Sequence, residues 1–232
     1  MNPLFLIPIV LVIAGVCFMI YMNKKHKTVA TAIDLEVERG KYEVYKQAVL
    51  AEDFSQLNVW MKGKSIDAFT SASVPESTAT KVEHLVSEGI QNVALSAIGL
   101  KLTSIETACF WVLSGSDLHF FSTDTAGELS EHIIFDAFRI EAAKLQYNGI
   151  LKSVLGVYSK SSAEYLPKVH LITFNIEGTE LTLEIHDRLN YVPDPMDLLN
   201  VEKQFRTRAK YQVVGERFIP ALQAKFANLT LK

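Results

Sequence analysis

Two carboxylate–histidine pairs are the residues in this chain whose types and spacing could support chemistry. Asp117 and His119 lie two residues apart, and so do Glu184 and His186. Residues two apart in a β-strand point to the same face, so each carboxylate would lie beside its imidazole. If the two strands were neighbours in space, the four side chains could perform general acid–base catalysis. The alternative is that both pairs lie on the solvent-facing side of a sheet and have no catalytic role.

No established catalytic or metal-binding motif accompanies these pairs. The chain lacks a phosphate-binding loop, a G-x-G-x-x-G pattern, a G-x-S-x-G elbow, an H-E-x-x-H pair and a C-x-x-C pair. None of the six histidines lies at metal-ligand spacing from another, and the two cysteines, Cys17 and Cys109, provide no disulfide framework. The net charge of −3 offers no basic surface for nucleic acid. We therefore expect a protein that is not an enzyme, with no cofactor, no metal and no nucleic-acid partner.

The second half of the chain has the alternation of apolar and polar residues that is typical of short antiparallel strands. Between Glu180 and His186 the leucine and isoleucine side chains face one way and the polar ones the other, which predicts a strand with one buried face. Gly115-Ser116 and Gly178-Thr179 predict hairpin turns. The expected strands are Thr107–Leu113, Asp117–Ser122, His132–Phe135, Phe138–Leu145, Ile150–Tyr158, Val169–Ile176 and Glu180–His186.

Helices are expected on both sides of these strands. Residues 62–80 are small and polar and predict a linker, after which a capping-box pattern opens a helix that ends near Gly99. Asp194-Pro195 opens a second helix, to about Arg208. The last helix has a regular apolar face, and Pro220 either kinks it or requires it to begin near Ile219. That face consists of Val214, Phe218, Leu222, Phe226 and Leu229.

The twenty residues from Pro3 to Met22 carry no charge. A helix of this length spans about 30 Å, the thickness of the hydrocarbon core of a bilayer. No basic residue precedes the run and no small-residue cleavage site follows it, so we expect a permanent transmembrane anchor and not a signal peptide. Lys24, Lys25 and Lys27 flank the run on its C-terminal side, which predicts an outside N-terminus and a cytoplasmic main body.

A helical stalk is expected after the anchor, from residue 28 to residue 61. Its second half carries an apolar stripe at helical spacing, made of Leu50, Phe54, Leu57 and Met61. We take this stripe as the candidate surface for contact with a partner or with a second copy of the chain. The alternative is that it docks on the chain's own folded domain.

The segment Phe110-Trp111-Val112-Leu113, which turns into Leu118-His119-Phe120-Phe121, resembles the first hairpin of bacterial pleckstrin-homology-like domains. The stretch IIFDAFRIEAAKL resembles the entry to the third and fourth strands, and the likeness covers roughly residues 105–230. The resemblance implies two bent antiparallel sheets capped by a C-terminal helix, and binding of lipid headgroups or proteins. The phosphoinositide site of the family uses Lys and Arg in the first hairpin, which this hairpin lacks.

The sequence as a whole predicts an α+β protein with three parts. Residues 1–27 form a transmembrane anchor with a basic flank, residues 28–100 a helical stalk and linker, and residues 101–232 a pleckstrin-homology-like β-barrel or sandwich capped by the C-terminal helix. The expected function is that of a non-enzymatic, single-pass scaffold or complex subunit in the inner or plasma membrane, which binds a protein partner or forms a homo-oligomer. The alternatives are a sensor or carrier for a lipid or small ligand and a divergent hydrolase-type enzyme.

Overall fold

The computed structural model of the 232-residue chain describes residues 6–75, 108–150, 167–176, 178–190 and 200–230. Two compact units share the chain. The helical unit contains Met1–Lys41 and Tyr191–Lys210, and the sheet unit contains Tyr42–Asn190 and Tyr211–Lys232. The described helices are α1 (Leu6–Ala32), α2 (Leu35–Arg39), α3 (Tyr42–Ala51), α4 (Ser55–Trp60), α7 (Ala137–Glu141), α8 (Val201–Glu216) and α9 (Phe218–Lys225).

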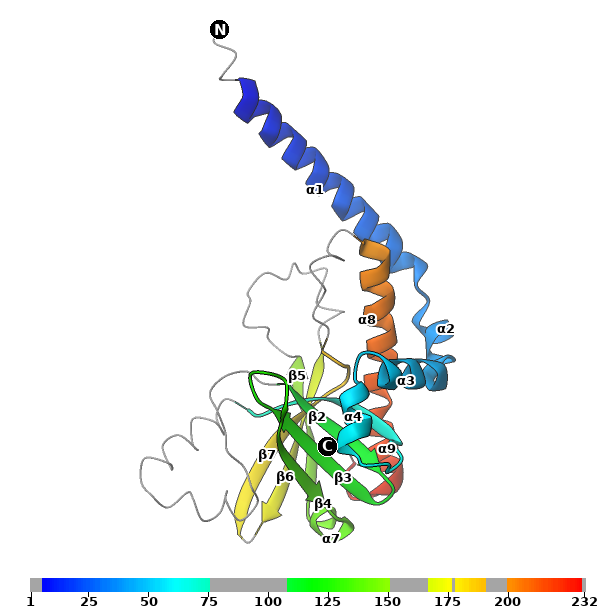
Figure 1. Ribbon diagram of the computed structural model, residues 1–232, viewed down its shortest axis with the longest axis vertical. Coiled ribbons are helices and arrows are strands. Elements are labelled where there is room, and N and C mark those ends of the chain that lie inside the picture. Colours follow the sequence, from blue (N-terminus) through cyan, green and yellow to red (C-terminus); the bar gives the residue numbers. More distant parts are fainter. Residues whose placement is uncertain (1–5, 76–107, 151–166, 177, 191–199, 231–232) are drawn as a thin grey trace, which may run out of the picture. The chain divides into compact units, whose positions relative to one another are not determined.

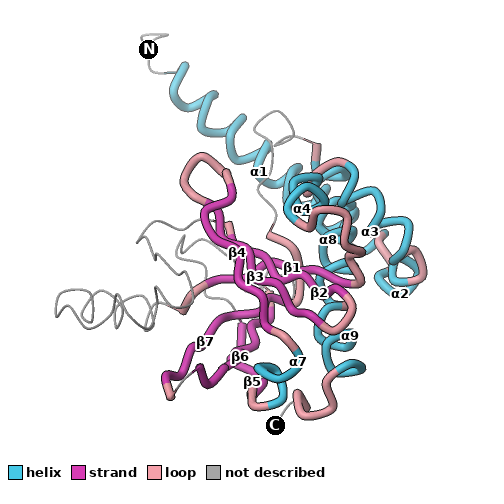
Figure 2. The backbone as a smooth tube through the Cα atoms, turned by 60° about the horizontal axis from the view of Figure 1, so that its bottom comes forward, coloured by secondary structure: helices cyan, strands magenta, loops and turns pink. Residues whose placement is uncertain are grey.

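The described strands form one antiparallel sheet in the order β4-β3-β2-β1-β7-β6-β5 (Figure 1). The sheet bends so that α7, which follows β4, also contacts β6 (Figure 2). A mixed α and β architecture with a seven-stranded antiparallel sheet is therefore present. The strands are β1 (Ala68–Ser73), β2 (Cys109–Ser114), β3 (Asp117–Thr123), β4 (Leu129–Phe135), β5 (Lys144–Ile150), β6 (Lys168–Ile176) and β7 (Thr179–His186).

Strand β1 comes from the segment expected to be a linker, and it lies at the centre of the sheet. It pairs with β2 on one side and with β7 on the other. Its sequence AFTSAS contains small and hydroxyl side chains that resemble a linker. Those hydroxyls find partners inside the fold, since Thr70 Oγ1 donates to the carbonyl of His186 at 2.7 Å. Burial of polar side chains is therefore compensated by hydrogen bonds that only the folded sheet supplies.

The strand expected at Phe138–Leu145 is instead a short helix followed by a strand. Asp136 caps α7 by accepting a hydrogen bond from the Arg139 amide at 3.0 Å, and β5 begins at Lys144. Helix α9 begins at Phe218, so Pro220 lies in its first turn, where its missing N–H is not needed. The helix expected from Thr80 to Gly99, most of the strand expected at Ile150–Tyr158 and the expected helix start at Asp194 lie outside the described residues.

The inner face of the sheet packs against α9 and forms the main hydrophobic core. The rings of Phe135 on β4 and Phe174 on β6 stack with their centroids 3.9 Å apart, and the Trp111 ring lies against both of them. Phe218 and Leu222 of α9 are fully buried in the same core. The side chains of α9 therefore occupy the inner face, where a lipid or small-ligand carrier would hold its ligand.

The outer face of the sheet is covered in part by α3 and α4. The predicted partner-contact residues are all buried here, with Leu57 fully buried and Leu50 the most exposed of the four at 9%. The ring of Phe54 contacts the rings of Phe69 and Phe110 on the sheet. Leu50, Phe54, Leu57 and Met61 thus dock on the chain's own domain, which was the alternative to a partner surface.

The predicted membrane anchor is wrong. No helix in the described part of the chain is both long enough and apolar enough to cross a membrane. Helix α1 runs without a break through Ala32, so its apolar residues share one helix with Lys24, Lys25 and Lys27 and with the polar turns that follow. Lys24 and Lys27 are exposed and Lys25 is half-buried. Because no helix among the described residues could span a membrane, the predictions that Lys24, Lys25 and Lys27 mark the end of a span, and of orientation, single-pass topology and membrane location, are wrong as well.

The helical unit has its own contacts between α1 and the first part of α8. The imidazole of His26 meets the ring of Phe205 edge-on, with centroids 5.7 Å apart, and the Arg208 guanidinium lies over the same ring. Burial lowers the pKa of His26, and the charges of Arg208 and Lys25 lower it further. His26 therefore contributes to this unit as a neutral aromatic side chain at neutral pH.

Substitution of Gly215 tests the packing of α8 within the sheet unit. A Cβ at Gly215 would lie 2.3 Å from the Cα of Arg188, so Gly215→Ala forces the backbones apart. We expect a loss of about 2–3 kcal/mol in the free energy of unfolding, measured by urea denaturation. An exposed helical glycine would instead gain about 1 kcal/mol on the same change. Gly40→Ala, in the helical unit, is the control and should change stability by no more than about 1 kcal/mol.

Candidate functional site

The two carboxylate–histidine pairs do not form one site. Asp117 and His119 lie on β3 and Glu184 and His186 lie on β7, and strands β2 and β1 separate them in the sheet. Asp117 instead faces Lys64, with 3.5 Å between its Oδ2 and the Lys64 Nζ. The combined acid–base cluster of four residues is therefore absent, although each pair has partners of its own.

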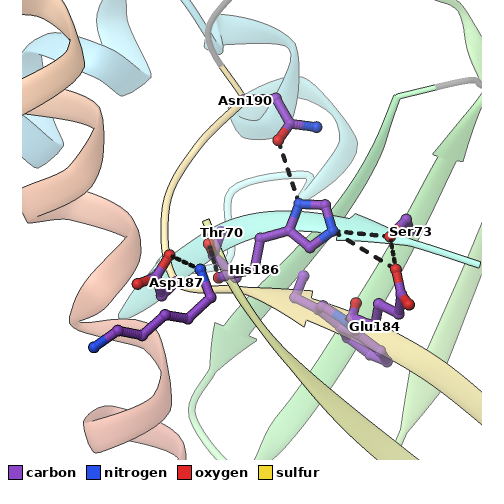
Figure 3. Close-up of polar contacts among 8 residues, drawn as sticks. Thr70, Ser73, Glu184, His186, Asp187 and Asn190 are labelled. Atoms are coloured by element: carbon purple, nitrogen blue, oxygen red, sulfur yellow. Dashed lines mark hydrogen bonds and ion pairs between the residues drawn. The ribbon is translucent and has the colours of Figure 1, made fainter. Parts of the chain in front are cut away.

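The pair on β7 belongs to a group of four side chains that we call the polar cluster: Ser73, Glu184, His186 and Asn190. Ser73 Oγ lies 2.8 Å from His186 Nε2 and also makes a hydrogen bond to the Glu184 carboxylate. His186 Nδ1 lies 3.3 Å from Asn190 Oδ1. Figure 3 shows the imidazole between Asn190 on one side and Ser73 with Glu184 on the other.

Strand pairing and backbone contacts hold the polar cluster in place. Ser73 on β1 is directly opposite Glu184 on β7, and His186 follows two residues later on the same face. Asn190 is positioned by its backbone amide, which donates to Ser71 Oγ at 2.8 Å. The indole of Trp111 donates to the carbonyl of Glu184 at 3.0 Å. Each member of the cluster is thus fixed by the sheet or by its neighbours.

Hydrogen bonds and burial set the pKa of Glu184 in the polar cluster. The hydrogen bond with His186 lowers the pKa of Glu184, burial opposes this, and the hydrogen bond from Ser73 lowers it again. Glu184 is therefore a carboxylate at neutral pH. Ser73 donates its one hydroxyl proton to the Glu184 carboxylate, so its oxygen accepts from the Nε2–H of His186, while Nδ1 of the same ring lies beside Asn190 Oδ1.

The second group consists of two histidines in contact, His119 of the β3 pair and His132. His119 Nδ1 lies 2.8 Å from His132 Nε2 on β4, and both rings stack against Phe121. Burial lowers the pKa of His119 to about 4, with a further contribution from His132. Burial also lowers the pKa of His132. Two histidines do not complete a metal site, and no group of three metal-ligating side chains occurs among the described residues.

A third feature is a set of three exposed apolar side chains spread along β4 and just beyond its end, which we call the edge surface: Leu129, Ile134 and Phe138. Phe138 on α7 is 82% exposed, more than any other large apolar side chain that the structure describes. Ile134 is opposite His119 and Leu129 is opposite Thr123, with a register shift between them. Because of this shift, Leu129 and Ile134 face the same side of the sheet although they are five residues apart.

The sequence identifies Glu184 and His186 as candidates, but it does not indicate Ser73 and Asn190, which are the partners of His186. It also does not indicate His132, which is the partner of His119. Ser73 lay in the supposed linker, and Asn190 lies beyond the end of β7. The sequence predicts a strand at His132, but nothing in it indicates that this residue lies opposite Phe121 and within hydrogen-bond distance of His119. Only the pairing of β1 with β7, and of β3 with β4, brings these side chains together.

The chain matches no known protein-family model, no curated protein and no solved structure. The resemblance to pleckstrin-homology-like domains therefore stays a prediction. The same holds for the expectation that the protein is not an enzyme.

The histidine pair predicts loss of stability in mild acid. His119 binds a proton near pH 6.5 when unfolded but only near pH 4 when folded, so the unfolded state takes up more protons between these values. The free energy of unfolding should fall as the pH drops from about 6.5, with His119 contributing on the order of 3 kcal/mol by pH 4. His119→Gln should reduce this slope in urea titrations at a series of pH values. An unchanged slope would contradict the assignment.

Proposed function

We propose that the chain is a protein-binding module whose β4 edge takes up an extended, basic segment of a partner protein. The observation that supports this most directly is the edge surface, where exposed apolar side chains lie beside the outer strand of the sheet. Three features of this region support the proposal: the open backbone of β4, the apolar side chains around it, and the charge of the segment that contains them.

Strand β4 is an edge strand within the described sheet, because it pairs with β3 alone. The outer side of an edge strand has backbone N–H and C=O groups available for another chain. An extended peptide that adds a strand there gains main-chain hydrogen bonds, and pockets or surfaces for alternate side chains give specificity. Among the side chains of the other edge strand, β5, whose exposure the structure describes, Tyr147 is the one large exposed apolar residue.

The edge surface supplies the apolar contacts that such a peptide would need. Ile134 and Leu129 lie on one face of β4, and Phe138 follows just beyond its C-terminal end. Single exposed apolar residues are ordinary, but a group of them beside an open strand is typical of an interaction site. Alternate residues of an added strand would face this group.

The charge of this region indicates a basic partner. The segment 124–141 contains five acidic residues and one basic residue, Arg139, for a net charge of −4. The same charge disfavours edge-to-edge pairing of two copies of this chain, because their acidic segments would repel each other. A partner segment with alternating Lys or Arg and apolar residues would satisfy both the charge and the apolar contacts.

The pleckstrin-homology-like resemblance supports a binding role, since binding of proteins or lipids is what it implies. The inner face of the sheet is filled by α9, which supports a site on the outside of the sheet. The proposal does not include a membrane, since no described helix could cross one.

Synthetic nonapeptides provide the test. We expect the fluorescein-labelled peptide with alternating Lys and Val to bind the full chain, as measured by fluorescence anisotropy, and the Glu-Val peptide of the same length to fail. A Lys-Val peptide with alternate backbone nitrogens methylated should lose binding, because it cannot complete the ladder on β4. Equal binding of the methylated peptide would show charge attraction alone and would contradict strand addition.

Substitution at the edge surface locates the binding site. Ile134→Glu and Phe138→Asp should each weaken binding of the Lys-Val peptide about tenfold or more, which is about 1.4 kcal/mol. Val59→Asp is the matched control, because Val59 is an exposed apolar residue that belongs to helix α4 and not to β4. Equal weakening by all three substitutions would place the site elsewhere.

A further inference from the structure

We propose that one exposed side of helix α1 docks an amphipathic helix of a partner protein, a helix that is apolar at one end and acidic at the other. This inference goes beyond the proposed function and does not rest on it, because α1 belongs to the helical unit and β4 to the sheet unit. The two surfaces also differ in chemistry, since the β4 edge is proposed to bind a basic, extended segment.

The exposed side of α1 is separate from the side that contacts α8. His26 meets Phe205 of α8, so the part of α1 that carries His26 lies against that helix (Figure 1). A row of exposed side chains is centred about a third of a helical turn away from His26. We call this row the α1 stripe: Ile13, Val16, Ile20, Lys24 and Lys27. All five of its side chains are exposed.

The α1 stripe has the spacing that helices use when they pack on each other. Its members follow one another after three, four, four and three residues, so they form one row along the helix. The stripe covers about 21 Å at 1.5 Å per residue. Ile13, Val16 and Ile20 form its apolar part, and Lys24 and Lys27 form its basic part. A helix lying along the stripe would therefore meet apolar side chains first and positive charge afterwards.

The charge around the basic part of the α1 stripe is positive on both helices. Helix α1 has three lysines and no acidic residue, and residues 200–210 have four basic residues and one acidic residue, Glu202. The guanidinium of Arg208 lies over the ring of Phe205, which His26 contacts, so the two basic segments meet although they come from opposite ends of the chain. The described residues of the helical unit have a net charge of +5, whereas the whole chain has −3. This local charge attracts an acidic partner and repels a basic one.

The α1 stripe fits an acidic protein helix better than a second copy of α1 or a nucleic acid. In a parallel pair of α1 stripes the lysines would face lysines, and in an antiparallel pair they would face Ile13 and Val16. A nucleic acid would contact the lysines through its phosphates but leave the apolar part in water. A helix with large apolar residues followed by Asp or Glu at the same spacing complements both parts, as in other cases where an amphipathic helix binds through its apolar face.

Synthetic peptides of about 20 residues test the proposal, since a helix can form in water at this length. The acidic peptide has leucines at three- and four-residue spacing in one half and glutamates at the same spacing in the other. We expect it to bind the full chain in fluorescence anisotropy, and to bind less tightly as the salt concentration rises. A peptide with glutamine in place of glutamate, and a scrambled peptide of the acidic composition, should each bind about tenfold more weakly or worse.

The Glu-Val nonapeptide is too short and too rich in valine to form such a helix, so we expect it to bind neither surface.

Reversal of the exposed charges locates the site on α1. The double variant Lys24→Glu, Lys27→Glu should bind the acidic peptide about tenfold more weakly. It should bind a peptide with lysine in place of glutamate more tightly than the unaltered chain does, an exchange of preference that loss of folding cannot produce. Ile20→Ser should weaken binding of the acidic peptide about fivefold. Lys144→Glu and Val44→Ser are the matched controls, exposed residues of the sheet unit, and should bind like the unaltered chain.

Four results would overturn the proposal. The first is failure of the acidic peptide to bind. The second is equal binding of the acidic and scrambled peptides, which would show charge attraction without docking of a helix. An unchanged preference in the double variant would place the contact elsewhere. Tighter binding of single-stranded DNA or of phosphatidylglycerol vesicles than of the acidic peptide would assign the α1 stripe to a nucleic acid or to a lipid surface.

Discussion

The insertion of β1 between β2 and β7 is the interaction on which the sheet unit depends. Five residues of β1 pair with β2, and Ala72 and Ser73 pair with Ile185 and Glu184 of β7. Strands β2 to β4 and strands β5 to β7 each form a meander, and within the described residues β1 alone joins them into one sheet. Loss of these pairings would leave two three-stranded pieces with unpaired backbone at their inner edges.

The central position of β1 also explains why its side chains are small and carry hydroxyls. Both of its faces are covered, so Ala68 and Phe69 are fully buried on opposite sides. Thr70, Ser71 and Ser73 are buried or half-buried too, and each makes a hydrogen bond within the sheet unit. A polar group in this position is stable only when its partner is already in place, so β1 and the region around β7 must form together.

The outer face of the sheet is apolar in one region and polar in two others. Near β2 and β3 it is apolar and lies under α4, where Trp60 meets Phe110 and Phe121. Near β7 it is polar and carries the polar cluster, and at β4 it carries the histidine pair. The two polar regions are separated by the apolar one, which keeps the imidazoles of β3 and β7 from acting together. The same separation keeps the edge surface apart from Ser73.

The local sequence pattern was sufficient to predict those strands and turns whose conformation depends only on neighbouring residues. The alternation in Glu180–His186 predicted β7, and the Gly115-Ser116 turn between two apolar runs predicted the β2–β3 hairpin, because period and turn chemistry are properties of the local chain. The same local argument failed at Phe138–Leu145, where the cap that Asp136 provides overrides the apolar pattern and makes a helical turn. The N-terminus is a second failure, because the length of the uncharged run predicts a membrane span, whereas no helix among the described residues is long and apolar enough to be one.

The amino-acid sequence by itself determined that Glu184 and His186 share one face of a strand, that the last helix has an apolar face, and that β7 has one buried side. Only the tertiary structure decided that the small polar residues of β1 form the central strand, that Leu57 and its neighbours are interior, and that Ser73 and Asn190 lie on either side of His186. The physical reason is that Ser73 and His186 are 113 residues apart. No local preference encodes a contact of that range, which comes instead from strand pairing and from the need to satisfy buried polar groups.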